Sequence, residues 1–508
     1  MLRTRAQLQW TSAPASADIH DQLTFAATSN HAESPVHYAV VNGEAATIDE
    51  STGVLTILSA GTVTVQAWQD ETANYTAAAI SQTLTITGVQ ENKFTNASGD
   101  KQWNNPANWV SGSVPTASET MKVTVSDTLE ICSDVQISSL TMEQDATVVI
   151  ANGGNLHVLG EPSSTDHKGS LSIKNGGQLH MKDDASLYVN DFGMETSIGG
   201  AGSDMSAQVF NVSRIHAEHA YLDIHLDPSG QVHDDTQWYG IAVPFSVKLT
   251  GIARKDASQF TPVKDGRDFM VYQYDMNKRL NTGKGWVRTT TNLQPGVFYY
   301  FTVNGANNTY RFYASSSEFT EQTSAPLLVN GTGADANWNG MSNSLFHYAS
   351  VDFENQDGAD AYVQVYLNGK SAYQVVKADE ASFVVGCPFF VQASQNSTLE
   401  LSNAESEQAF YAPQRTATQS TTVKVQLRNA ANDQDQLYLT ASETASTTYT
   451  LGHDLAKAGV ATSIPQVWVA EYAKQLCVHE TLLHNDEAFC SLGIYAPKTG
   501  TYTSRLTK

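Results

Sequence analysis

Several features that would point to common catalytic or membrane functions are scarce in this chain of 508 residues. It has only four cysteines, Cys132, Cys387, Cys477 and Cys490, and none is in a C-x-x-C pair. That spacing excludes a zinc ribbon and a dithiol redox site. No apolar run approaches the roughly 18 residues needed to span a bilayer, and the first ten residues lack the apolar core of a signal peptide, so a protein that does not span the membrane is expected.

Positive charge is also scarce. Lys and Arg total 29 against 52 Asp and Glu, for a formal charge of −23, so the field of the chain repels phosphate backbones. Nucleic acid is therefore excluded as a partner. Charged residues make up 16%, below the roughly 25% of an ordinary soluble domain, and small, hydroxyl and β-branched residues take their place, which favours exposed β-structure.

The motifs of common enzymes are absent as well. No G-x-S-x-G pentapeptide occurs, and "NTGKGW" around Lys284 lacks the spacing of a phosphate-binding loop. The adjacent acids Asp183 and Asp184 point to opposite faces of a strand, so they do not form a general acid/base pair. The sequence predicts no catalytic residue, no cofactor and no enzyme.

Residues 1–89 alternate in strand fashion. In "GTVTVQAW", Val63, Val65 and Ala67 share one face, and turn signals recur at the short spacing of a β-sandwich. The order V-x-Y, A-T-I-D, G-x-L-T, A-G-T-V-T-V-x-A and N-Y-x-A-A resembles the bacterial Ig-like repeat. That resemblance implies a spacer or adhesive module in which Gly53 and Tyr75 are structural.

Residues 90–227 open with "KQWNNPANWVSGSVPT", which contains Trp103 and Trp109. The segment resembles the entrance to short β-solenoids in secreted bacterial surface proteins, which implies that both indoles are packed lids over a solenoid end. The alternative, that they form a platform contacting sugar ligands, requires exposed coplanar rings.

Two near-repeats follow the entrance segment. "NGGNLHV" begins at Asn152 and "NGGQLHM" at Asn175, 23 residues later. This spacing predicts one coil of a parallel β-solenoid per repeat, with alternate residues such as Leu171 and Ile173 inside.

Residues 228–413 contain aromatic strands broken by Gly, Pro and Asn, and residues 414–508 contain further strands, such as "VKVQLRN" and "PQVWVAEY", that predict a C-terminal β-sandwich. Four landmarks occur in order: Trp238 with "PF" at 244–245, "PG" at 295–296, "WNG" at 338–340 with Asn343, and "PFFVQA" at 388–393. The order resembles the sandwich region of proteins exported by the type IX route of gram-negative anaerobes. Ser344 stands where such proteins usually have proline. The predicted fold class is therefore all-β: an Ig-like sandwich, a short parallel β-helix and two or more sandwich modules of jelly-roll type.

Two clusters contain metal-ligand residue types. His216, His219, His225 and His233 lie close together in the sequence, but His216 and His219 are three apart and face opposite sides of a strand. Acidic turns at 354–362 and 429–436 leave structural calcium open as an alternative to solvated turns. No metal site is predicted.

Cys477 and Cys490 flank a plausible hairpin, together with His479 and His484. Two interpretations remain open: a disulfide formed in an oxidising compartment, or two ordinary buried thiols.

We therefore expect a non-catalytic protein, extracellular or on the outer-membrane surface of a gram-negative bacterium, that presents loops to glycans or host surface proteins. Two alternatives are an accessory region of a larger secreted peptidase or glycan-degrading enzyme, and a carbohydrate-binding module.

Overall fold

The computed structural model confirms the all-β fold class, with 57% of the chain in strands. The structure describes residues 3–19, 21–87, 90–115, 121–160, 169–198, 205–226, 232–233, 236–257, 259–304, 309–316, 318–353, 362–368, 372–404, 422–459, 461–484 and 487–507. Its contacts divide into two compact units: the first holds residues 1–124, 135–140 and 157–169, and the second holds the rest. Among the described residues, no helix is long and apolar enough to cross a membrane.

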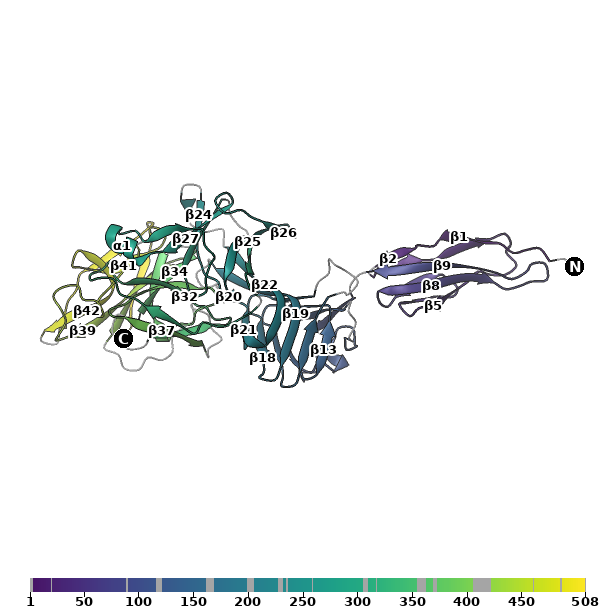
Figure 1. Cartoon of the computed structure of the whole chain (residues 1–508), viewed down its shortest axis with the longest axis horizontal. Coiled ribbons are helices and arrows are strands. Elements are labelled where there is room, and N and C mark those ends of the chain that lie inside the picture. The colour runs from purple at the N-terminus through teal and green to yellow at the C-terminus, as the bar shows by residue number, and fades with distance from the viewer. Residues whose placement is uncertain are drawn as a thin grey trace. The chain divides into compact units, whose positions relative to one another are not determined.

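The N-terminal part of the first unit is a β-sandwich (Figure 1). One sheet has the order β2 (Ser16–Asp18), β9 (Ala78–Thr87), β8 (Gly61–Gln69), β5 (His37–Asn42), and the other has the order β3 (Leu23–Thr24), β7 (Val54–Ile57), β6 (Ala46–Ile48). A separate pair is formed by β1 (Leu8–Ser12) and β4 (Ala26–Ser29).

The burial of β8 confirms the predicted alternation, because Val63, Val65 and Ala67 are buried in the sandwich core. Gly53 has a φ of 71°, and a Cβ there would lie 2.1 Å from the carbonyl oxygen of Phe25, so the turn requires glycine. The ring of Tyr75 stacks on His31 at 4.0 Å.

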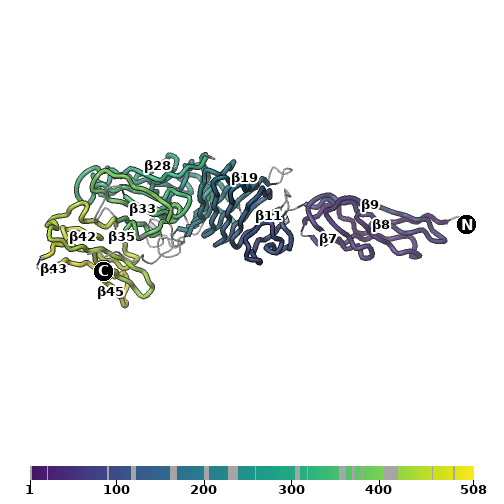
Figure 2. The backbone as a smooth tube through the Cα atoms, turned by 90° about the horizontal axis from the view of Figure 1, so that it is seen from below, coloured from purple at the N-terminus to yellow at the C-terminus, as the bar shows by residue number. Residues whose placement is uncertain are grey.

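The second unit contains parallel coils, which Figure 2 shows beside β19. Four strands pair in parallel in the order β12 (Thr128–Ile131), β15 (Thr147–Ile150), β18 (Gln178–Met181), β21 (Gln208–Phe210). Their inward residues stack in one buried row, formed by Leu129, Val148, Leu179 and Val209. A second sheet stacks β17 (Ser170–Ile173), β19 (Ser186–Ile198) and β22 (Ile215–Leu226) in the same parallel sense. Leu171 and Ile173 point inward, as predicted.

The predicted 23-residue coil is wrong. Partners in the first sheet are separated by 19, 31 and 30 residues, as the pairs Thr128↔Thr147, Thr147↔Gln178 and Gln178↔Gln208 show. The strand after the first Asn-Gly-Gly turn, β16 (Asn155–Val158), pairs with β13 (Asp134–Ile137) and β19, whereas the strand after the second turn is β18 in the other sheet. Each of the two corners contains a glycine with positive φ, Gly153 in the first and Gly176 in the second. The Asn-Gly-Gly repeat therefore identifies a similar corner before two different sheets, and its spacing is not the length of a coil.

The sheet of β22 does not end at the expected boundary near residue 228. β22 pairs antiparallel with β30 (Thr309–Ala314), which pairs with β25 (Val247–Asp256) and through it with β26 (Gln259–Pro262). The last strand of the other solenoid sheet is also covered, because the amide of Val209 donates to the carbonyl of Phe346 at 2.7 Å. The solenoid and the following sandwich therefore share one hydrogen-bonded framework.

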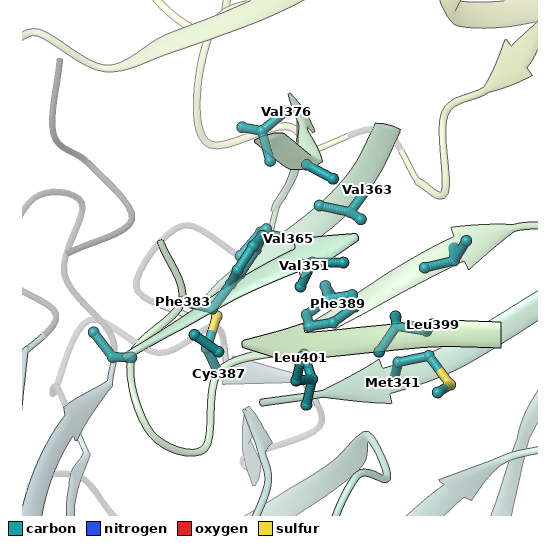
Figure 3. Close-up of a cluster of buried hydrophobic side chains, with 14 of the residues drawn as sticks. Met341, Val351, Val363, Val365, Val376, Phe383, Cys387, Phe389, Leu399 and Leu401 are labelled. Atoms are coloured by element: carbon teal, nitrogen blue, oxygen red, sulfur yellow. The ribbon is translucent and has the colours of Figure 1, made fainter. Parts of the chain in front are cut away.

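In the described part of the chain, the sandwich after the coils contains three sheets. A five-stranded sheet has the order β23 (Val232–His233), β24 (Thr236–Ile241), β29 (Tyr299–Asn304), β27 (Phe269–Tyr274), β28 (Trp286–Thr289). A four-stranded sheet has the order β32 (Trp338–Ser342), β36 (Pro388–Gln392), β34 (Tyr362–Leu367), β35 (Ala372–Lys377), and a three-stranded sheet has β31 (Ser324–Leu327), β37 (Ser397–Asn403), β33 (Ala349–Phe353). Val363, Val365 and Phe389 lie in the core between the last two sheets (Figure 3).

One short helix was not predicted. The helix α1 (Met276–Thr282) follows β27, and the carboxylate of Asp275 caps it by accepting from the amides of Asn277 and Lys278. Gly283, with a φ of 72°, ends it. Seven residues are too few to give a visible helical period in the sequence.

The C-terminal sheet has the order β44 (Leu492–Tyr495), β41 (Gln466–Glu471), β42 (Lys474–His484), β39 (Gln434–Ser442), β38 (Thr422–Asn429), β45 (Tyr502–Thr507). It packs on the preceding sandwich. Gln436 donates to the carbonyl of Val375 at 2.7 Å, and the rings of Tyr438 and Tyr362 are 4.7 Å apart.

Candidate functional site

The two tryptophans of the entrance segment lie inside the protein. Trp103 is 4% exposed and Trp109 is 3% exposed, and their rings meet edge to face at 4.8 Å and 75°. The indole N–H of Trp109 donates to the carbonyl of Trp103 at 2.8 Å, and the ring of Phe94 packs on Trp109 edge to face at 5.1 Å. This is the geometry of a packed core, whereas a sugar platform would need exposed, coplanar rings.

A hydrogen-bond network holds the loop that carries these indoles. Asn108 is fully buried and donates to Asp100 and to the carbonyl of Gln102, while its Oδ1 accepts from Ser98. The backbone amide of Gln102 and the side-chain amides of Asn105 and Asn108 donate to the Asp100 carboxyl and lower its pKa well below its usual range. The Asn-rich run between the tryptophans thus closes a tight loop.

Cys477 and Cys490 are separate thiols in the structure, which shows no disulfide between them. The Sγ of Cys477 points into the core of the C-terminal sheet and lies 3.5 Å from the carbonyl oxygen of Leu455, whereas Cys490 lies beyond β43 (Glu487–Ala488) at the edge of that core. Cys477 is a buried thiol and Cys490 is a partly exposed one. Burial raises the pKa of Cys477 to about 12, so the sulfur is a weak nucleophile and a poor metal ligand there.

His479, the histidine near Cys477, interacts with the carboxylate of Asp454. His479 Nδ1 and Asp454 Oδ1 are 2.7 Å apart, and both side chains are buried. The side chain of His484 lies outside the described residues. The pair connects the segment before β40 (Leu455–Ala456) to β42. Because His479 is paired in this way, it does not form a set of metal ligands with the Cys477 thiol.

The upstream histidine cluster does not converge either. His216, His219 and His225 are on β22, and His216 stacks on Tyr188 at 4.8 Å while His225 faces Glu195. The side chain of His233 is not among the described residues. No group of three His, Cys, Asp or Glu side chains able to hold a metal occurs in the described ranges.

The acidic turns give a similar picture. The turn at 354–361 lies outside the described residues. In the turn at 429–436, Asn429 accepts from the amides of Ala431 and Asp433 and donates to the Asp433 carboxylate at 3.0 Å. The side-chain oxygens of Asn429 and Asp433 therefore accept hydrogen bonds from donors within the turn itself.

One cluster of catalytic residue types does form, and no pattern in the sequence had indicated it. Glu195 on β19 and Asp223 on β22 are direct cross-strand partners on adjacent parallel strands. Glu195 is bound by Lys174 at 2.7 Å and by His225 at 3.3 Å. The one available signal was the constant 28-residue offset between β19 and β22, which cannot be seen until the register is known.

The environments of the two carboxylates differ. Burial acts to raise the pKa of Glu195, but hydrogen bonds from His225 and Lys174 outweigh it, so the pKa is lowered. Burial raises the pKa of Asp223 even though the Arg311 guanidinium opposes that shift. A pair of carboxyl groups with opposite shifts is a pattern seen in acid/base catalysis, so the accessibility of the pair decides its role.

Arg311 closes this cluster. Its Nε and Nη2 donate to the two oxygens of Asp223 at 2.7 and 2.8 Å, and its guanidinium lies 3.5 Å from the ring centre of Tyr221 and 3.8 Å from that of Phe260. A Cβ at Gly193 would overlap the Tyr221 ring, so glycine allows the ring to lie on the sheet. Both oxygens of Asp223 therefore accept hydrogen bonds from Arg311, and the Asp223 side chain is 8% exposed. The cluster joins the solenoid strands β19 and β22 to β30.

A groove in the second unit presents charged groups that are less fully paired. It has a volume of about 580 Å³ and is lined by Arg279 of α1, Asp335, Lys457, Lys474 and Gln475, together with four alanines. Figure 1 shows α1 beside β41, and Lys474 begins the next strand. Arg279 Nη2 is 3.6 Å and Lys474 Nζ is 3.7 Å from the two oxygens of Asp335.

A second cavity, of about 850 Å³, lies in the N-terminal sandwich between β1, β4 and β9. Its lining is mainly alanine and short polar residues, with Arg5 as the one charged group among the described residues that line it. The Arg279 groove is therefore the site with the more selective chemistry.

Comparison with known proteins adds little about this site. No family model matches the sequence, and no curated protein matches it. Two cadherin structures overlap it weakly: Drosophila N-cadherin EC1-4, at 14% identity and a TM-score of 0.15 over 20% of this chain and 29% of that one, and mouse cadherin-23 EC22-24, at 15% identity and a TM-score of 0.14 over 25% and 40%. The chain thus spans less than half of either structure. Overlaps with such low scores carry no argument about function.

Proposed function

We propose that this chain is a non-catalytic adhesion protein, extracellular or on the outer-membrane surface of a gram-negative bacterium, and exported by the type IX route. It would present loops and the Arg279 groove to glycans or host surface proteins from a series of β-modules. The resemblance of its sequence landmarks to such surface proteins supports the export route.

The observation that carries the non-catalytic proposal is the Arg311 clamp on Asp223. The carboxylates of Glu195 and Asp223 are bound by Lys174, His225 and Arg311, and their side chains are only 13% and 8% exposed. A general acid or base must reach the proton that it transfers, so the ion pairs and the burial of these carboxylates support a structural role.

Two measurements test the proposal. The purified chain is screened on arrays of glycans and host surface proteins, and the same sample is assayed against panels of peptide and polysaccharide substrates. Binding without turnover is expected. Turnover that is abolished by Asp223→Asn in a folded variant would refute the non-catalytic assignment.

The location is tested separately. Antibodies against the N-terminal sandwich should label intact cells of the source bacterium, and a strain lacking the type IX machinery should lose that label. Labelling only after lysis would contradict the surface location.

A further inference from the structure

We infer that the Arg279 groove binds a carboxylate-bearing sugar unit of an acidic glycan, with Arg279 and Lys474 as the groups that recognise the carboxylate. The inference rests on the proposed adhesion function and specifies the ligand class of one site. A volume of about 580 Å³ lies within the usual range for small-ligand sites.

The groove is lined by positively charged side chains, although the chain as a whole is strongly negative. Arg279 and Lys474 face it with one partly exposed carboxylate, Asp335, in a protein of formal charge −23. Lys457 contributes no free charge, because its ammonium is buried and donates to Asp435 and, at 3.2 Å, to Gln466. The groove therefore has a local excess of positive charge.

Asp335 holds the two cations only loosely. Its contacts of 3.6 and 3.7 Å exceed the 2.7–3.2 Å of a hydrogen bond, and its side chain is 49% exposed. Arg279 Nε is shielded from solvent and has no hydrogen-bond partner in the described residues. A ligand carboxylate placed between Arg279 and Lys474 would form shorter, charge-assisted bonds while Asp335 turns toward solvent.

Ring contacts and hydrogen bonds hold the walls of the groove in place before a ligand binds. The Arg279 guanidinium lies 4.6 Å from the ring centre of Trp338, whose indole N–H donates to the carbonyl of Ala334 at 2.8 Å. Gln392 donates to the carbonyls of Ala334 and Ala336. A rigid guanidinium and loop reduce the entropy that a ligand loses on binding.

The opposite rim contains strained backbone. Glu471 pairs with Lys474 across a two-residue hairpin turn, and both turn residues, Tyr472 and Ala473, have positive φ values of 54° and 55°. Such turns normally use Asn-Gly. Strain of this kind gathers at functional sites, and Lys474 directly follows the turn.

The lining favours a sugar over a peptide terminus. Four alanines form the apolar part of the wall, and they offer little apolar surface to a large terminal side chain. Gln475 offers an amide that both donates to and accepts from hydroxyl groups. A polar ring carrying one carboxylate fits this combination.

The test is isothermal titration of the full chain with trigalacturonate and with its methyl ester, which keeps the sugars and removes the charges. The acid should bind, and the ester should bind at least about tenfold more weakly. Arg279→Gln and Lys474→Gln should each weaken binding of the acid by about tenfold. Asp335→Asn should tighten it by about two- to threefold, since it removes the competing carboxylate.

Lys248→Gln is the matched control, because it removes one positive charge from an exposed position outside the groove and should leave the affinity unchanged. Equal binding of acid and ester, or equal losses in Lys248→Gln and Lys474→Gln, would overturn the inference. So would preferential binding of a tripeptide with a free C-terminus. If array binding persists in Arg279→Gln, the adhesion proposal stands and only this site assignment fails.

Discussion

Replacement of Arg311 by alanine tests whether the carboxylate cluster is a structural junction. Arg311 is 17% exposed and forms two short hydrogen bonds to Asp223, which is 8% exposed. Breaking a buried ion pair costs about 3–5 kcal/mol because the remaining charge is left without a partner. The residual exposure reduces this, so we expect Arg311→Ala to lower the free energy of unfolding by about 3 kcal/mol.

Calorimetry of the second unit measures this loss. A unit of this length unfolds with an entropy of about 2 cal/mol/K per residue, so the melting temperature should fall by about 4 °C. Arg311→Lys, which keeps the charge but loses the paired hydrogen bonds and the flat stacking on Tyr221 and Phe260, should recover about half of the loss.

The loss should also depend on pH. Burial already raises the folded-state pKa of Asp223, and removal of Arg311 raises it further. A raised folded-state pKa adds stability below the unfolded pKa of about 4, and that stability is lost as pH rises through the folded value. The deficit of Arg311→Ala should therefore be smaller at pH 5 than at pH 7.5. A deficit under about 0.5 kcal/mol at both pH values would show that the pair behaves as an ordinary surface contact and would refute the junction argument.

Three further predictions concern other parts of the chain. Trp109→Ala should destabilise the first unit by about 3–5 kcal/mol, measured by thermal unfolding, whereas a loss below about 1 kcal/mol would contradict its core role. Ala473→Gly should stabilise the second unit by about 0.5–1 kcal/mol in denaturant titration because it relieves a positive φ, and destabilisation would count against strain in the turn. At pH 8 without reductant, a thiol reagent should modify exposed Cys132 first and Cys477 only after unfolding; all four thiols should react in denaturant, and a count of two would reveal a disulfide.

The sequence by itself determined the class of fold and the inward faces of strands. Alternation with period two put Val63 and Val65 in one core and Leu171 and Ile173 in another, and the Asn-Gly-Gly turns contain Gly153 and Gly176 with the positive φ that glycine permits. These features are local, since the pleat and the φ preference of glycine act over a few residues. A short window of residues is therefore enough to predict them.

Only the tertiary structure decided the register of the coils and what that register brings together. The coil lengths of 19, 31 and 30 residues depend on how much chain each corner takes up, which no local pattern encodes. The pairing of Glu195 with Asp223 follows from that register. Arg279 and Lys474, far apart in the sequence, meet across one groove because a helix after one sheet and a hairpin of another pack together, and such long-range convergence depends on the buried surfaces of whole elements.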